Sequence, residues 1–133
     1  DSVKILESPN LIIGQRAFNN SKISNLDIMY DTLLNSVSED EKISPFLNTL
    51  ISDMISIYNA KIPFPPRFFA NLGIKKINIL NLNAQGIKYV PYYAFSPDYL
   101  GLESEIEELL LIGNPLYDVE EGAFKHVKKV HFW

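Results

Sequence analysis

One short segment of the chain carries a spacing of apolar residues that recurs along the sequence. Residues 106–116 read Ile-Glu-Glu-Leu-Leu-Leu-Ile-Gly-Asn-Pro-Leu, which fits the pattern L-x-x-L-x-L-x-x-N-x-L. Alternation of Leu109 and Leu111 is the period of a strand with one buried face. Asn114 follows where the chain must turn, and its amide is suited to bonding the backbone of adjacent coils. The segment therefore predicts a strand followed by a turn.

The same spacing returns elsewhere in the chain. Residues 77–87 and 23–33 repeat it, with Gln85 and Asp31 at the position of Asn114, and two degraded copies lie at residues 3–18 and 55–72. Such a unit cannot bury its apolar side alone, so successive units must stack into a solenoid. We expect one domain over residues 1–133, with about five coils and a sixth that begins at Val130. The third apolar strand position is expected at Ile5, Ile28, Ile57, Leu82 and Leu111.

The segments that return from one strand to the next carry phenylalanines and Ser-Pro pairs. Ser44 and Pro45 suit the N-cap and first turn of a short helix, and Ser96-Pro97 indicates a turn. Because a phenylalanine follows four of the five predicted strands at a similar distance, these rings are expected to point inward and stack. They are Phe18, Phe69, Phe95 and Phe124.

The repeats resemble the leucine-rich repeat family over essentially the whole chain. The closest resemblance is to the animal extracellular type, in which a phrase such as residues 121–124, Glu-Gly-Ala-Phe, closes the convex side. The resemblance implies an α/β fold: a right-handed leucine-rich-repeat solenoid with a parallel concave sheet of five to six short strands. The convex side is then irregular or short-helical. It also implies that the concave face binds another macromolecule.

Charge and composition argue against several classes of function. A net charge of −4 disfavours nucleic acid as the partner, and no apolar run is long enough to insert this segment into a membrane. The chain has no cysteine, and His126 and His131 are expected on different faces. No nucleophile elbow, glycine-rich phosphate loop or calcium-binding loop is present in the sequence. We therefore expect a protein that is not an enzyme and uses no cofactor or metal.

The ends of the solenoid and a glycosylation sequon bear on the context of the chain. Without cysteine, no disulfide-bonded cap can cover the terminal coils, so we expect part of a longer chain. Uncapped coils expose strand edges, which predicts self-association through the solenoid ends. Asn19-Asn20-Ser21 is a possible glycosylation site at Asn19 and favours an extracellular or secretory location.

The candidate site consists of outward strand positions from adjacent coils. They combine aromatic, thioether, aliphatic and amide groups, a composition typical of surfaces that bind a protein or a glycan. This composition favours a non-enzymatic recognition module. The alternative is a structural or accessory non-catalytic subunit that packs through its solenoid ends in a larger assembly. The predicted partner-binding residues are Met29, Tyr30, Tyr58, Asn59, Asn81, Asn83, Leu110 and Ile112.

Overall fold

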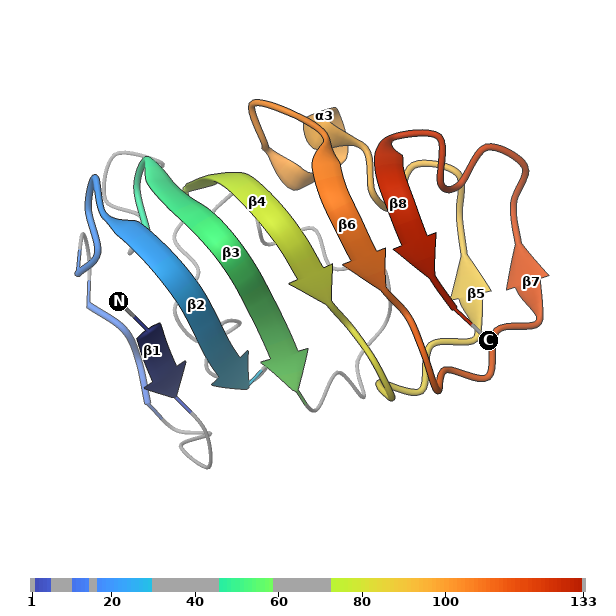
Figure 1. Cartoon of the computed structure of the whole chain (residues 1–133), viewed down its shortest axis with the longest axis horizontal. Coiled ribbons are helices and arrows are strands. Elements are labelled where there is room, and N and C mark those ends of the chain that lie inside the picture. Colours follow the sequence, from blue (N-terminus) through green and yellow to red (C-terminus); the bar gives the residue numbers. More distant parts are fainter. Residues whose placement is uncertain (1, 6–10, 15–16, 30–45, 59–72, 133) are drawn as a thin grey trace.

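A computed structural model describes residues 2–5, 11–14, 17–29, 46–58 and 73–132. Six parallel strands lie side by side in sequence order and form one sheet, as Figure 1 shows. Parallel pairing of consecutive strands requires the chain to return across the molecule after each strand, which makes a solenoid. The strands are β1 (Ser2–Ile5), β2 (Lys22–Met29), β3 (Thr49–Tyr58), β4 (Ile74–Asn81), β6 (Ile106–Leu110) and β8 (Val127–His131).

The register of the sheet aligns the apolar strand positions of successive coils. The second apolar position forms one continuous row of register partners, and its central members Leu26, Ile55 and Leu109 are fully buried. Leu82 and Leu111 are also buried, although each lies one residue beyond the end of its strand. The predicted strand order, parallel pairing and buried faces are therefore confirmed. The row is Val3, Leu26, Ile55, Leu80, Leu109 and Val130.

The last strand begins earlier than the sequence pattern predicted. Val127 pairs with Ile106, and Val130 pairs with Leu109. Val130 is thus the second apolar position of the sixth coil, so the expectation that this coil begins at Val130 is wrong. Two residues separate Val127 from Val130, as two separate Ile106 from Leu109.

A β-bulge explains why the third coil looked degraded in the sequence. Ile51 is the register partner of Ile23 and Ile77, and Ile55 is the partner of Leu26. Three residues separate Ile51 from Ile55, whereas two separate the equivalent pair in β2, and the register shifts at this point. One extra residue in one strand of a pair is the definition of a bulge. The third coil therefore has its full set of apolar positions, spread over a longer strand.

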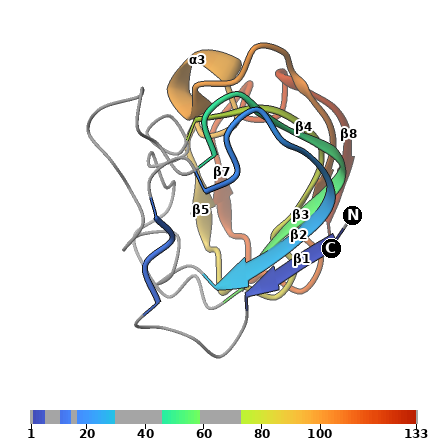
Figure 2. The same cartoon turned by 90° about the vertical axis from the view of Figure 1, so that its left-hand side faces the viewer.

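The return side is less helical than expected and contains a second sheet. β5 (Tyr89–Val90) pairs in parallel with β7 (Asp118–Val119), and Figure 2 shows both across the interior from the six-stranded sheet. α3 (Pro97–Leu100) is the single helix among the described residues. Its N-cap Ser96 accepts a hydrogen bond from the Tyr99 amide, in keeping with the expected Ser-Pro turn. The α/β description is therefore wrong for this part of the chain, which is a β-solenoid. The helix expected at Ser44–Pro45 lies outside the described residues.

Aromatic stacking joins adjacent coils in pairs. Phe18 stacks on Phe46 with ring centroids 5.0 Å apart, and Phe95 stacks on Phe124 at 6.2 Å. Phe46 is fully buried and supplies a ring that the repeat pattern did not include. Stacking between two of the predicted phenylalanines is thus confirmed for Phe95 and Phe124, whereas Phe18 stacks on a ring that was not predicted and Phe69 lies outside the described residues.

The turns that lead into β2, β3 and β4 share a left-handed residue at one position. Asn20, Asn48 and Gly73 lie one or two residues before these strands and have φ of 56°, 57° and 84°. Asparagine tolerates this conformation better than most residues, and glycine adopts it freely. Gly73 also lies against the preceding coil, where a Cβ atom would stand 2.7 Å from the Cα of Leu47. Only glycine fits there without a shift of the backbone.

Asn114 joins two coils at the turn that leaves the sheet. Its Oδ1 accepts from the amides of Gln85 and Ile87 at 2.8 and 3.0 Å. Its Nδ2 donates to the carbonyls of Leu82 and Leu111 at 2.8 and 3.0 Å. The predicted role of this amide is confirmed. In the coil before it, Gln85 donates from Nε2 to the nearby carbonyl of Asn83.

Candidate binding face

We call the solvent-facing side of the six-stranded sheet the outer face; it is the side expected to be concave. Side chains alternate along a strand, so every second residue between the buried positions points to this side. Cross-strand pairing then places residues far apart in sequence in one row. The central outer row is Lys4, Asp27, Ser56, Asn81, Leu110 and His131.

Part of the predicted site is brought together on this face. Met29 and Tyr58 are register partners at the ends of β2 and β3, and Asn81 is the partner of Leu110 in the central row. Ile112 donates its amide to the Oδ1 of Asn83 at 2.7 Å. These six residues therefore follow the end of the sheet from β2 to the turn after β6. Tyr30 and Asn59 lie outside the described residues.

The two described asparagines of the predicted site, Asn81 and Asn83, form hydrogen bonds within the protein. Asn81 accepts the amide of Asn83 at 3.0 Å and donates to the hydroxyl of Ser56 at 3.2 Å. Asn83 uses its Oδ1 to hold the amide of Ile112. Their amides help to align adjacent coils, which sequence spacing alone did not indicate. Tyr58, with 40% of its surface exposed, offers more area to a partner.

Ion pairs lie toward the two edges of the outer face. Lys4 is 3.8 Å from Asp27 at the β1 edge. At the β8 edge, Lys128 bonds Glu107 and His131 bonds Glu108, both at 2.8 Å. The hydrogen bond with Glu107 raises the pKa of Lys128 above its usual value. Between these edges the face carries apolar and amide side chains, with Lys22, Asp53 and Lys76 toward the starts of the strands.

The structure adds a cavity that the sequence did not reveal. It has a volume of about 380 Å³ and lies near the starts of the strands. The one sequence signal for it is the four-residue step from Ile51 to Ile55, because the bulge in β3 disturbs the sheet surface there. The cavity is lined by Lys22, Leu50, Ile51, Ser52, Lys76, Asn78 and Glu107.

Tyrosines gather on the return side, around β5 and α3. Tyr92 and Tyr93 pack edge to face at 5.2 Å, and Tyr93 contacts Tyr99 at 4.9 Å. Tyr89 donates its hydroxyl to the carboxylate of Glu120, which raises the pKa of Tyr89 to about 12. Glu120 also accepts the amide of Tyr92. The carboxylate thus ties the second sheet to the turn that follows β5.

Asn19 and the last coil are the remaining places that bear on function. Asn19 is exposed within a turn closed by the amide of Ser21 and the carbonyl of Phe18. At the last described coil, a second cavity of about 300 Å³ is lined by Asn114, Leu116, Tyr117, Val119 and Phe132. Tyr117 and Phe132 are 79% and 48% exposed.

Helices long and apolar enough to cross a membrane are absent from the described part of the chain. Those same residues contain no cluster of three or more acidic, histidine or cysteine side chains that could hold a metal ion. Comparisons with protein-family models, with curated proteins and with solved structures gave no match.

Proposed function

We propose that this β-solenoid is a non-enzymatic recognition module of the leucine-rich-repeat type, which binds a protein or glycan through its outer face. The repeat type is supported by the L-x-x-L-x-L spacing of three coils and by the bonds of Asn114 to two coils. In such a solenoid, each coil contributes one strand to an extended surface. Function then depends on which side chains the coils present in each row.

The observation that carries the proposal is a group of apolar side chains left accessible on an ordered sheet. Tyr58 and Leu50 are 40% and 37% exposed, on the same strand, β3. Met29, Leu110 and Ile112 are half-buried on neighbouring coils. Partly exposed aromatic and aliphatic groups on a rigid surface contribute binding energy at a low cost in conformational entropy. The ion pairs at the two edges suit the polar rim of an interface.

The test compares variants of the outer face with a variant of the return side. A partner is first identified by screening immobilised proteins and glycans. Tyr58→Ala should then weaken the binding of that partner by about 1 kcal/mol or more. Tyr92→Ala, which removes an exposed tyrosine from the return side, should leave the affinity unchanged. Both variants should keep a melting temperature close to the wild type. Loss of binding with Tyr92→Ala alone would reject the outer face.

A second candidate function is a structural or accessory subunit that packs through the solenoid ends. It is favoured by the cavity at the last coil, whose wall includes the exposed Tyr117, Val119 and Phe132. An apolar edge next to unpaired strands is a site for packing against another chain. Sedimentation over a concentration series would test it, with Phe132→Ser as the variant. Concentration-dependent association that this variant abolishes would support packing through the end.

The secretory location is part of the same proposal. Asn19 is exposed in its turn, where a glycan would project into solvent. Expression in cells that glycosylate secreted proteins should give a mass increase that N-glycosidase removes. Asn19→Gln should eliminate that increase, while a chain of unmodified mass would remove this support for the secretory route.

A further inference from the structure

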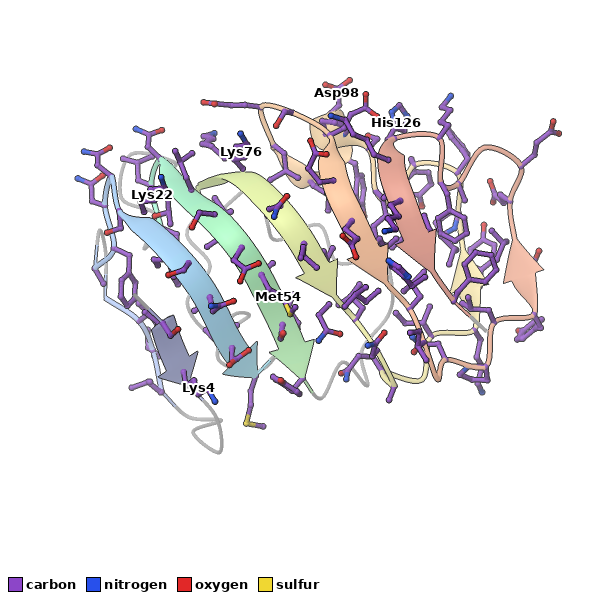
Figure 3. All side chains as sticks on the ribbon, in the orientation of Figure 1. Lys4, Lys22, Met54, Lys76, Asp98 and His126 are labelled. Carbon is purple, nitrogen blue, oxygen red and sulfur yellow. The ribbon has the colours of Figure 1, made fainter. Side chains whose placement is uncertain are left out.

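The cavity over the β3 bulge has a chemical character different from that of the rest of the outer face. Lys22, Leu50 and Lys76 are register partners on β2, β3 and β4, so an apolar side chain stands between two lysines. Figure 3 marks Lys22 and Lys76 at the starts of β2 and β4, on either side of β3. All three side chains are exposed. This row therefore forms a solvent-exposed part of the cavity wall, which a partner could contact.

The lysines of this row have no acidic partner among the described residues, unlike Lys4 and Lys128. Lys4 and Lys128 each form an ion pair, but within the described residues Lys22 and Lys76 form none. Their charges are therefore available to a ligand. In a chain with net charge −4, two unpaired cations around one cavity are a local exception to the overall charge.

Two acidic groups lie nearby and limit what the site would accept. Glu107 lines the cavity, but Lys128 holds its carboxylate at 2.8 Å and offsets its charge. Asp53 is exposed on the bulge of β3, although it does not line the cavity. Ser52 and Asn78 add a hydroxyl and an amide to the wall. The cavity thus offers cations, neutral polar groups and an apolar surface to a ligand.

We propose that this cavity binds an acidic helical segment of a partner protein, with one carboxylate at Lys22, another at Lys76 and an apolar side chain over Leu50. This inference deepens the proposed recognition function and rests on it. A protein segment fits better than a glycan because none of the described residues that line the cavity offers an aromatic ring to stack on a sugar. Carboxylates also match the two free cations in charge.

The spacing of the row selects a helix over an extended segment. Lys22 and Lys76 are two strands apart, which corresponds to about 9.6 Å at a strand spacing of about 4.8 Å. Residues i and i+7 of a helix lie on one face about 10.5 Å apart, with i+4 between them. Same-face residues of an extended chain repeat at about 6.6 Å, which places none at that distance. A helix with Glu, Leu and Glu at i, i+4 and i+7 therefore matches the row.

The experiment uses synthetic helical peptides as probes. A labelled peptide with Glu, Leu and Glu at i, i+4 and i+7 should bind the whole chain, as measured by fluorescence anisotropy. The Gln-for-Glu version should bind at least about fivefold more weakly, the sum expected for two exposed ion pairs. A peptide with the second Glu moved to i+5 should also bind more weakly, because its two carboxylates no longer lie on one face of the helix. Binding should also weaken in about 0.5 M salt.

Protein variants assign the binding to the cavity. The double variant Lys22→Gln with Lys76→Gln should lose at least about fivefold in peptide affinity. Lys129→Gln, an exposed outer-face lysine on β8, serves as the matched control and should change affinity less than about twofold. No peptide binding, or equal binding by the double variant, would overturn the inference. So would binding of a sulfated oligosaccharide, but not the peptide, through the two lysines. The proposed recognition function would be rejected separately if Tyr58→Ala left the affinity for a natural partner unchanged.

Discussion

The N-terminal and C-terminal coils of this solenoid follow one apolar spacing but hold their neighbours by different means. β2 and β3 are 8 and 10 residues long and pair along nearly their whole length. β6 and β8 have only 5 residues each. The C-terminal coils add side-chain amides and a second sheet, through Asn83, Asn114 and the pairing of β5 with β7. Among the described residues, the N-terminal coils are thus joined mainly by long backbone ladders, with side-chain bonds such as that from Thr49 to the carbonyl of Phe18. The C-terminal coils have shorter ladders, which side-chain amides and a second sheet supplement.

This difference has a consequence for where the molecule is sensitive to substitution. A backbone ladder is spread over many residues, so no one side chain in it is essential to the hydrogen bonding. In the C-terminal coils, by contrast, the amide of Asn114 alone serves four backbone groups. The N-terminal coils are expected to be sensitive where backbones approach closely in the turns before the strands, as Gly73 does to Leu47.

The largest effect is expected from a charge placed in the shared core. Leu111→Asp in the C-terminal region and Ile28→Asp in the N-terminal region each put a carboxylate at a fully buried position. Each should cost more than about 4 kcal/mol and unfold the domain, because the charge has neither water nor a partner. Circular dichroism and thermal melts would show it. Glu121→Ala, at an exposed position, is the control. If only one region unfolded, the two would be independent folding units.

The next effect separates the two kinds of coil junction. Asn114→Ala leaves two amides and two carbonyls without their partner and should lower the free energy of unfolding by about 3 kcal/mol or more. Gln85→Ala removes a bond to the carbonyl of Asn83 and should cost less than Asn114→Ala. Urea denaturation of both variants gives the two values. Equal losses would mean that Asn114 has no special role in the C-terminal coils.

A smaller loss is expected from the N-terminal turns. Gly73→Ala should cost about 2 kcal/mol because it combines an unfavourable φ with a close approach to Leu47. Asn48→Gly keeps the left-handed turn without a side chain and should change the free energy of unfolding by less than about 1 kcal/mol. The pair is measured by urea denaturation. A Gly73→Ala variant as stable as the wild type would show that the turn adjusts easily.

The smallest effect concerns the return side at high pH. The pKa of Tyr89 is raised from 10.0 to about 12 by its hydrogen bond to Glu120, so the folded state retains the phenolic proton longer than the unfolded state. The stabilisation is fully present below pH 10.0 and is lost as pH rises through about 12. The difference in melting temperature between wild type and Tyr89→Phe should therefore shrink across this window. A difference in melting temperature that does not change with pH would contradict the hydrogen bond between Tyr89 and Glu120.

The repeat spacing predicted what depends on the buried face of each strand. Leu26, Leu80 and Leu109 had to align because only stacked coils bury them, and Asn114 was recognisable because a turn residue with both a donor and an acceptor can serve two coils. Strand bulges were not predictable in this way, since the extra residue in β3 faces solvent and leaves the apolar order unchanged.

The finer properties of the outer face also escaped prediction. The sequence could not reveal that Asn81 bonds Ser56 and that Asn83 bonds Ile112 in the neighbouring coils, because these contacts depend on cross-strand register. The row of Lys22, Leu50 and Lys76 was hidden for the same reason: the residue numbers of its members differ by 28 and 26. The composition of the predicted patch was evident from sequence, but the hydrogen bonds that its asparagines form within the protein were not.

The bulge in β3 shows that a strand of this solenoid can change length without disturbing its neighbours. Ile51 and Ile55 keep the register of the flanking coils, and the additional residue is accommodated between them on the solvent side. Insertions at this point would alter the shape of the outer face while leaving the interior packing as it is. Such a protein can acquire new surface relief during evolution one codon at a time, on the face that we propose contacts a ligand.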